Sequence, residues 1–336
     1  MATRTLRAAL LTAAVFIPAL AGWLARECRT PYTGPGTNAF FEVPRGRSVR
    51  AVLGALRDRG LVRSSLGLTL AYDLFWSRER LRAGEYEFTF PASGREVLFK
   101  IFRGRIYLRP VTVPEGLTGD EVAGIAADRA GVEPGPFRDA FHETKLVAEW
   151  DAKARDLEGY LFPDTYLLPR KVTAAALVEA MVGGFEKAFG EAWRKRAAET
   201  GMSVRDAVTL ASLIEKETGL DAERPLVSAV FHNRLRLGMK LDCDPTVIFA
   251  LRREDKYSGR LLSRDLKFPS PYNTYLHPGL PPGPICNPGR PSLEAALYPA
   301  AGDYLYFVAQ GDGSHHFSRT FAEHQKAVAR YHLKKN

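Results

Sequence analysis

The chain has 336 residues, 46% of them hydrophobic and 25% charged, which is typical of a folded protein of about two domains and not of a disordered chain. Its three cysteines form no Cys-x-x-Cys pair, which argues against a disulfide framework or a cysteine zinc motif. The net charge of +9 suits anionic lipid headgroups or an anionic polymer. We expect no nucleic-acid partner, because no binding motif accompanies the charge.

The only long apolar run covers residues 8–24 and has arginines on both sides. Its length approaches the roughly 20 residues of a transmembrane helix, so we predict a membrane anchor over residues 1–29. A cleaved export signal is the alternative, because Pro-Ala-Leu-Ala at 18–21 looks like a small-residue cleavage site. A buried core helix is a third interpretation, which the terminal position and the basic flanks disfavour.

A Pro- and Gly-rich linker over residues 30–39 precedes a predicted basic module over residues 40–109. Between Arg45 and Arg109 stand thirteen arginines and one lysine against six acidic residues, so most of the excess charge lies here. Periodicity and capping residues predict a strand, two helices, a strand and a helix in this module. The predicted elements cover residues 40–43, 49–59, 65–76, 82–88 and 94–102.

A second domain is predicted over residues 110–336, after a strand at 106–113. Thr118 and Glu121 have capping-box spacing for a helix that follows at once. Past residue 237 the pattern reads as loops, with Pro and Gly concentrated between 269 and 291. The further predicted elements are helices at 119–130, 136–141, 174–189, 204–218, 223–237, 292–297 and 320–333 and a strand at 304–309. The fold class expected from this order is α+β.

Two carboxylates, Glu215 and Glu217, end the apolar helix predicted at 204–218. A helix C-terminus carries partial negative charge, so an acid held there in apolar surroundings should keep its proton to higher pH, as a general acid requires. The two side chains lie about 200° apart around the helix, so they cannot both face one cleft. Periodicity alone does not choose between them, and an exposed surface turn is the alternative.

Two further segments, residues 231–246 and 270–285, combine amides, aromatic rings and stiff loops. This composition suits a long polar groove in which sugar faces stack on rings and hydroxyl groups bond to amides. Each segment alone could equally be a structural loop. His315 and His316 have no third ligand at suitable spacing, so no metal is expected.

Several motifs in order resemble those of the endolytic murein transglycosylases, a family called MltG or YceG-like. They are Leu-Glu-Gly-Tyr-Leu-Phe-Pro-Asp-Thr-Tyr at 157–166, Glu-Lys-Glu-Thr at 215–218, Asn-Arg-Leu at 233–235, Asp-Pro-Thr at 244–246, Tyr-Asn-Thr-Tyr at 272–275 and Gly-Leu-Pro-Pro-Gly-Pro-Ile at 279–285. The stretch at 304–309, with Gly313, His315 and Phe317, looks like the family's C-terminal signature.

The resemblance implies an N-terminal transmembrane helix, a LysM-like α+β module and a mixed α+β catalytic domain. It implies a single-pass protein of the inner membrane, with the catalytic domain on the outer face and wall-synthesis enzymes as neighbours. The substrate would be the peptidoglycan glycan strand, cut between MurNAc and GlcNAc with a 1,6-anhydroMurNAc end and no cofactor. The family's catalytic glutamate falls on Glu217, with Glu215 as the secondary candidate.

The candidates for substrate binding are Asn233, Asp244, Tyr272, Asn273 and His315. Two rival hypotheses stay open. An ordinary glycoside hydrolase would pair Glu217 with Asp164 or Glu158. A non-catalytic peptidoglycan-binding or scaffolding protein would depend on the basic module instead.

Overall fold

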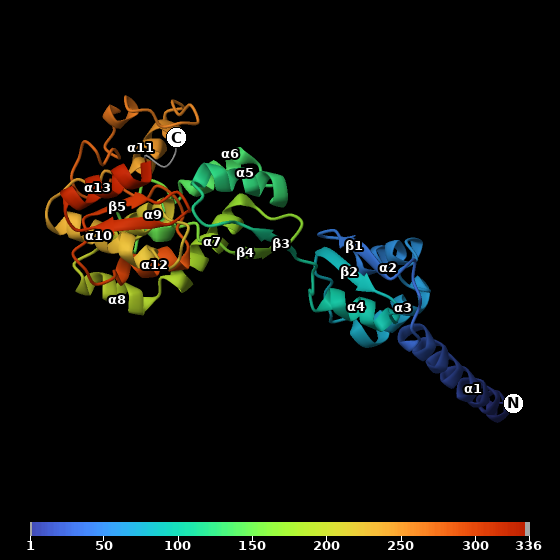
Figure 1. Ribbon diagram of the computed structural model, residues 1–336. Helices are drawn as coiled ribbons and strands as arrows, with labels where there is room; N and C mark the ends of the chain where they lie inside the picture. Colours follow the sequence, from blue (N-terminus) through green and yellow to red (C-terminus); the bar gives the residue numbers. More distant parts are fainter. Residues whose placement is uncertain (1, 333–336) are drawn as a thin grey trace. The chain divides into compact units, whose positions relative to one another are not determined.

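The computed structural model describes residues 2–332, with side chains from Ala14 to Tyr331. The chain divides into two compact units, which are described separately below. Unit 1 contains Met1–Arg109 and Leu167–Arg170, and unit 2 contains Pro110–Tyr166 and Lys171–Asn336. Helices and short strands occur in both, so the described chain is a mixed α+β protein (Figure 1). The predicted domain limits stay predictions.

Unit 1 is built on an antiparallel pair of strands, β1 (Asn38–Val43) and β2 (Gly84–Thr89), in which Phe41 lies opposite Tyr86. Helices α2 (Val49–Asp58), α3 (Ser65–Ala71) and α4 (Gly94–Phe102) and the π-helix η1 (Tyr72–Trp76) pack near this pair (Figure 1). Helix α1 (Ala2–Arg29) contacts α3 and α4 and then extends away from them. The predicted order of strand, two helices, strand and helix over residues 40–102 is confirmed.

The core of unit 1 is closed by side chains that alternate inward from the strands and by one face of each helix. Tyr86 is fully buried, and its hydroxyl donates to the carbonyl oxygens of Arg82 (2.7 Å) and Ile101 (3.3 Å). Leu24 and Cys28 of α1 belong to the same core. The last turns of α1 therefore pack into the core of unit 1.

The predicted transmembrane helix over residues 1–29 is wrong. No helix in the described part of the chain combines the length and the apolar character that a membrane span requires. A membrane span needs about 20 apolar residues. The side chains of α1 are described from Ala14 on, and the charged residues Arg26, Glu27 and Arg29 lie at the end of the helix. The first part of the predicted apolar run lies outside the residues whose side chains are described.

Strands β3 (Arg109–Thr112) and β4 (Thr165–Leu168) pair with each other, and the division between the units passes through both. The sequence predicted β3 as part of a longer strand and did not predict β4. Within unit 1, the buried carboxylate of Glu85 pairs with Arg109 and, at 3.3 Å, with Arg170. Hydrogen bonding to Arg109 is the main reason that the pKa of Glu85 lies below its usual range.

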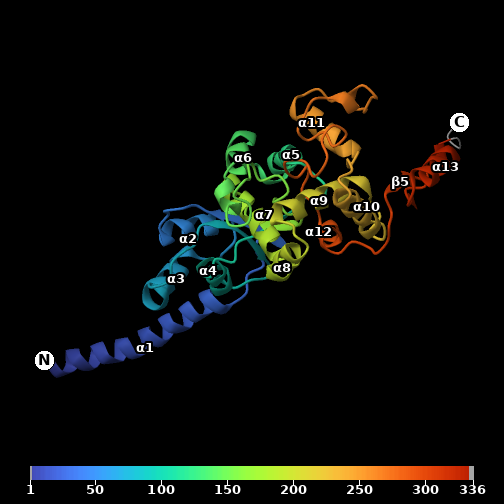
Figure 2. The same ribbon diagram turned by 90° about the vertical axis from the view of Figure 1, so that its left-hand side faces the viewer.

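Unit 2 is mainly helical. Its helices are α5 (Gly119–Ala130), α6 (Pro134–Phe141), η2 (Thr144–Val147), α7 (Ala174–Ala188), α8 (Glu191–Glu199), α9 (Val204–Glu217), α10 (Arg224–Arg236), α11 (Asp244–Arg253), η3 (Asp265–Lys267), α12 (Arg290–Leu297) and α13 (Phe321–His332). Strands β5 (Tyr306–Ala309) and β6 (His315–Ser318) form an antiparallel hairpin. The hairpin and α13 pack together beside α10 (Figures 1 and 2).

Helix α9 is the central element of unit 2, since α8, α10, α11 and α12 all pack on it (Figure 2). Every residue from Ala207 to Ile214 is buried, which leaves only the two ends of the helix near solvent. The N-terminus is held by a capping box between Ser203 and Asp206. The C-terminus, with its two glutamates, is thus fixed in place by four neighbouring helices.

A loop over residues 284–289 also packs against α9, at Ser212. The Ile285 amide donates to Ser212 Oγ (3.0 Å), and Asn287 bonds to Leu117 and Leu161 in neighbouring segments. Gly159 has a φ of +87° and a Cβ there would lie 2.5 Å from Pro284, so this position needs glycine. The Leu-Glu-Gly-Tyr and Gly-Pro-Ile motifs are therefore two parts of one packing contact.

Candidate active site

Glu217 is the last residue of α9, and Thr218 after it is already extended. Its side chain is partly buried, neither free in solvent nor enclosed in the core. Four residues from three other places in unit 2 act on its carboxyl group: Cys243, Asp244, His315 and Arg234. The Glu217 carboxyl group thus lies among polar partners that come from α10, the start of α11 and β6.

Burial raises the pKa of Glu217 to about 7, in the direction that the sequence predicts. The negative charge of Asp244 raises this pKa further, while a hydrogen bond from Cys243 and the positive charges of His315 and Arg234 lower it. The Cys243 thiol is itself buried, and its pKa is well above the ordinary value, so it stays a hydrogen-bond donor. Near neutral pH, Glu217 can therefore exist both as acid and as carboxylate.

His315 is positioned by Glu223, which the sequence did not single out. The His315 backbone amide donates to Glu223 Oε1 at 2.8 Å, and its ring Nδ1 lies 2.7 Å from Glu223 Oε2. Thr218 Oγ1 also contacts Glu223 Oε2, at 3.4 Å. This carboxylate therefore links the hairpin to the end of α9 and leaves His315 Nε2 free to act on other groups.

Arg234 of α10 is a structural support of the site. Its Nε donates to the Leu305 carbonyl at 2.7 Å, and its Nη1 donates to Leu241 at 3.0 Å and to Asp242 at 3.1 Å. Its guanidinium also stacks 5.2 Å from the centre of the Tyr306 ring. One side chain therefore joins the hairpin to the segment that carries Cys243 and Asp244.

Asp244 begins α11 and accepts a 2.6 Å hydrogen bond from the Tyr275 hydroxyl. Tyr275 ends the Tyr-Asn-Thr-Tyr motif, and Thr274 beside it accepts a hydrogen bond from the Cys243 amide at 3.0 Å. The loop that the sequence predicted as part of a groove thus contacts the Glu217 neighbourhood through Tyr275 and Thr274. Neither residue was among the sequence candidates.

Asn233 and Asn273 have their amides occupied within the protein. Asn233 Nδ2 donates to the carbonyls of Gly302 and Tyr304, both at 2.9 Å. Asn273 is fully buried and donates to Leu266 and Phe268 at 3.0 and 2.8 Å. Both amides donate to loop carbonyls, and their predicted role in substrate binding stays a prediction.

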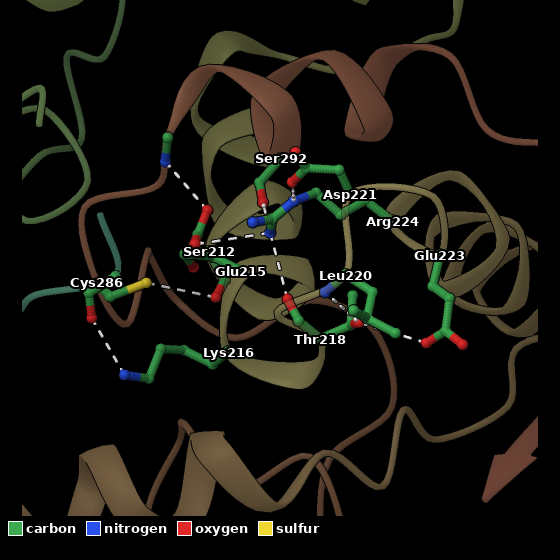
Figure 3. A network of polar contacts seen from close by, with 12 residues as sticks. Ser212, Glu215, Lys216, Thr218, Leu220, Asp221, Glu223, Arg224, Cys286 and Ser292 are labelled. Carbon is green, nitrogen blue, oxygen red and sulfur yellow. Dashed lines mark hydrogen bonds and ion pairs between the residues drawn. The ribbon is translucent and has the colours of Figure 1, made fainter. Parts of the chain in front are cut away.

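Glu215 points to the other side of α9, into a different network (Figure 3). Its carboxylate lies 3.6 Å from Arg224 and accepts a 3.1 Å hydrogen bond from the Gly289 amide. Arg224 also donates to Ser292 Oγ at 2.8 Å and to Asp221 at 3.0 Å. Through these contacts Glu215 and Arg224 link α9, α10 and the start of α12.

Tyr272 does not lie with the group around Glu217. It lines a separate cavity of unit 2, and its ring packs 5.0 Å from that of Phe249. The structure therefore brings together Glu217, Asp244 and His315 of the sequence candidates. No cluster of three or more His, Cys, Asp or Glu side chains suited to a metal occurs among the described residues.

A carboxyl group with a pKa near neutrality, close to a histidine and an aspartate, has the properties that general acid–base chemistry requires. Residues 41–330 match the YceG-like family, and the chain belongs to that family. It is 33% identical over 316 residues to the endolytic murein transglycosylase of Bacillus subtilis, an alignment that covers 89% of this chain and 86% of the relative.

An endolytic murein transglycosylase of Streptococcus pneumoniae is 27% identical over 322 residues, which cover 86% of this chain and 57% of the relative. Among solved structures, a yceG-like protein from Listeria monocytogenes, known from a 2.6 Å crystal structure, is similar with a TM-score of 0.60 and 30% identity. That similarity covers 86% of this chain and 98% of the Listeria chain. The likeness therefore extends over both units.

The pH dependence of the reaction follows from the raised pKa of Glu217. The acid form must be present when substrate binds, so kcat/KM should be level below about pH 7 and fall about tenfold per pH unit above it. Initial rates on purified glycan strands between pH 5 and 9 measure this. A profile that is level from pH 6 to 9 would show that no group with this pKa acts as the acid.

Proposed function

We propose that this protein is an endolytic lytic transglycosylase of peptidoglycan in which Glu217 is the one acid–base group. The observation that carries the proposal is the single carboxyl group with a pKa near 7 at the end of α9, in reach of a histidine and an aspartate. The family membership and the names of the relatives support the substrate, murein, and the cut within the strand.

The reaction needs only one such group, because the nucleophile belongs to the substrate. Protonated Glu217 donates to the glycosidic oxygen between MurNAc and GlcNAc as the bond from C1 to that oxygen breaks. The Glu217 carboxylate then accepts the proton of the MurNAc C6 hydroxyl while O6 attacks C1. The products are a free GlcNAc hydroxyl and a 1,6-anhydroMurNAc end, and no water is consumed.

The neighbours of Glu217 have distinct tasks in this proposal. The Cys243 thiol donates to the carboxylate and holds its orientation, while Arg234 fixes the segment that carries Cys243. Asp244, held by Tyr275, keeps the pKa of Glu217 high. His315, held by Glu223, balances the charge that develops when Glu217 gives up its proton.

For unit 1 we propose a LysM-like role in holding the glycan strand. A cavity of about 370 Å³ lies in this unit beside β2 and α4. Its lining includes the partly buried ring of Phe99, which can stack on a sugar, and Lys100 and Arg103, which can contact anionic groups. We also propose that the protein works on the outer side of the plasma membrane, where peptidoglycan lies, next to wall-synthesis enzymes.

The products of digestion in water enriched in ¹⁸O test the proposed reaction. Mass spectrometry should show anhydro ends, one water lighter than reducing ends, without ¹⁸O. Reducing ends that carry ¹⁸O would instead establish a hydrolase, in which a second acid such as Glu158 or Asp164 activates water or forms a glycosyl intermediate. No fragments at all would support the scaffold hypothesis.

A further inference from the structure

A cavity of about 290 Å³ lies in unit 2 apart from the group around Glu217. The C-terminal end of α11, the segment around Arg155 and the loop around Tyr272 line it. Its walls combine Arg155, Arg205 and Arg253 with Asp156, Glu158 and Glu254. Some of these charges are paired within the protein, and others remain open to a ligand.

Arg205 and Glu254 both have charged partners within the protein. Arg205 donates to Asp151 at 2.5 Å and, through Nε, to the Pro282 carbonyl at 2.8 Å. The Glu254 carboxylate is paired with Lys256 at 2.6 Å. Arg205 thus shapes the cavity, and Lys256 offsets the charge of Glu254, whose side chain is 49% exposed.

Glu158 contributes little negative charge near neutral pH. It is buried, and burial raises its pKa to about 8. Its carboxyl group already accepts the Gly119 amide at 3.1 Å and the Asn287 amide at 3.1 Å. At neutral pH it is therefore mostly protonated, which leaves the arginines of this wall in excess.

Arg155 and Arg253 are the cations that remain open to a ligand. Arg253 pairs with Asp156 at 3.2 Å, but its side chain is 46% exposed, so part of its guanidinium faces solvent. Arg155 is exposed and forms no ion pair with the side chains described from Ala14 to Tyr331. Tyr272 adds a hydroxyl group at the same wall, on a ring fixed against Phe249. Two guanidinium groups and a phenol recognise a carboxylate.

Helix α11 connects this cavity to the catalytic group. It begins at Asp244, beside Glu217, and ends at Arg253, which lines the cavity. Its ten residues rise about 14 Å from first to last. A peptide of four extended residues spans up to about 14 Å, so a peptide attached to a sugar at Glu217 reaches the cavity.

We propose that this cavity binds the stem peptide of the peptidoglycan strand. Arg155 and Arg253 would bind the carboxylates of that peptide. The proposal rests on the proposed function and adds a substrate preference to it. MurNAc carries the stem peptide on its lactyl group, and the stem has free carboxylates along its length and at its end. Strands that retain their peptides are thus the preferred substrate, and peptide-free strands lack this contact.

The test compares two substrates, glycan strands with their stem peptides and the same strands after an amidase has removed them. The full-length variant Arg155→Gln should raise KM for peptide-bearing strands about tenfold, as expected for one charged hydrogen bond, and leave KM for stripped strands unchanged. Arg129→Gln is the matched control, because Arg129 is also exposed in unit 2 and lies on α5, away from the cavity lining. It should change neither value.

Equal effects of Arg155→Gln on the two substrates, or no effect on either, would overturn the peptide site. If the wild-type protein cuts neither substrate, the proposed function fails, and titration of the protein with a soluble stem peptide decides about the cavity by itself. A Kd about tenfold weaker in Arg155→Gln than in wild type supports the site. The same Kd in both proteins rejects it.

Discussion

Replacing Glu217 by glutamine is expected to lower kcat for strand cleavage by about 10²- to 10⁴-fold, which is the typical contribution of a positioned acid–base group. The amide has the same shape but cannot donate a proton to the glycosidic oxygen or accept one from the C6 hydroxyl. Strand binding should stay close to that of wild type, because the change leaves the neighbours Arg234 and His315 in place. Release of soluble fragments from purified sacculi, together with co-sedimentation, measures both.

We expect the Glu217→Gln variant to fold normally, and the reason is the raised pKa of Glu217. The folded-state pKa of Glu217 is raised to about 7, so folding favours its protonated form. The stability that this group contributes is complete below the unfolded pKa and is lost as the pH rises toward 7. At pH 8 the glutamine variant should therefore melt no lower than wild type. If it trims strands as fast as wild type, Glu217 is not the catalytic acid.

Replacing Arg224 by methionine is expected to destabilise unit 2 by about 3 kcal/mol. The change removes the guanidinium of Arg224 (Figure 3) and leaves the Glu215 carboxylate, whose side chain is 7% exposed, without its ion-pair partner. For a domain of this size the melting temperature should fall by roughly 10 °C. Thermal unfolding of the full chain followed by circular dichroism measures this shift.

Asp221→Asn is the matched control, since Asp221 pairs with the same arginine but has a side chain that is 77% exposed. Loss of this exposed pair should cost less than about 1 kcal/mol. Equal melting temperatures for Arg224→Met and wild type would show that the Glu215 network does not hold α9, α10 and α12 together. Glu215 would then be free of this structural constraint and would be the next candidate to test for catalysis.

The local elements of this protein could be read from its sequence because their signals are local. The apolar stretch before Glu215 predicts α9, and the spacing of Thr118 and Glu121 predicts the start of α5, where both reciprocal hydrogen bonds are present. Helix α11 was missed, although Pro245 in its first turn is typical of a helix start. The many loop-forming residues around Pro245 favoured the prediction of a loop over that of a helix.

The partners of Glu217 could not be predicted in the same way. Cys243 and His315 reach it from α11 and β6, and contacts between such distant segments leave no periodic trace in one sequence. Glu223 is known as the partner of His315 only from the folded chain. Periodicity could not choose between Glu215 and Glu217, and the contact of Glu215 with Arg224 likewise forms only in the folded chain.

Amide-rich loops proved ambiguous for a physical reason. Asn233 and Asn273 were predicted to bind sugar hydroxyls, yet turns contain backbone carbonyls without partners, and these amides satisfy them. The apolar N-terminal run was ambiguous too. Composition cannot distinguish a membrane span from a helix whose end, at Leu24 and Cys28, packs into the hydrophobic core of unit 1.

Direct titration of the Glu217 carboxyl group is the most decisive measurement. Carbon NMR of protein with labelled glutamate side chains, assigned by loss of one signal in Glu217→Gln, reports the pKa of this group in the folded chain. We predict a value of about 7 that coincides with the fall of kcat/KM at high pH. Titration near the ordinary glutamate value of about 4.3, with the fall in rate unmoved, would contradict the assignment of Glu217 as the proton donor.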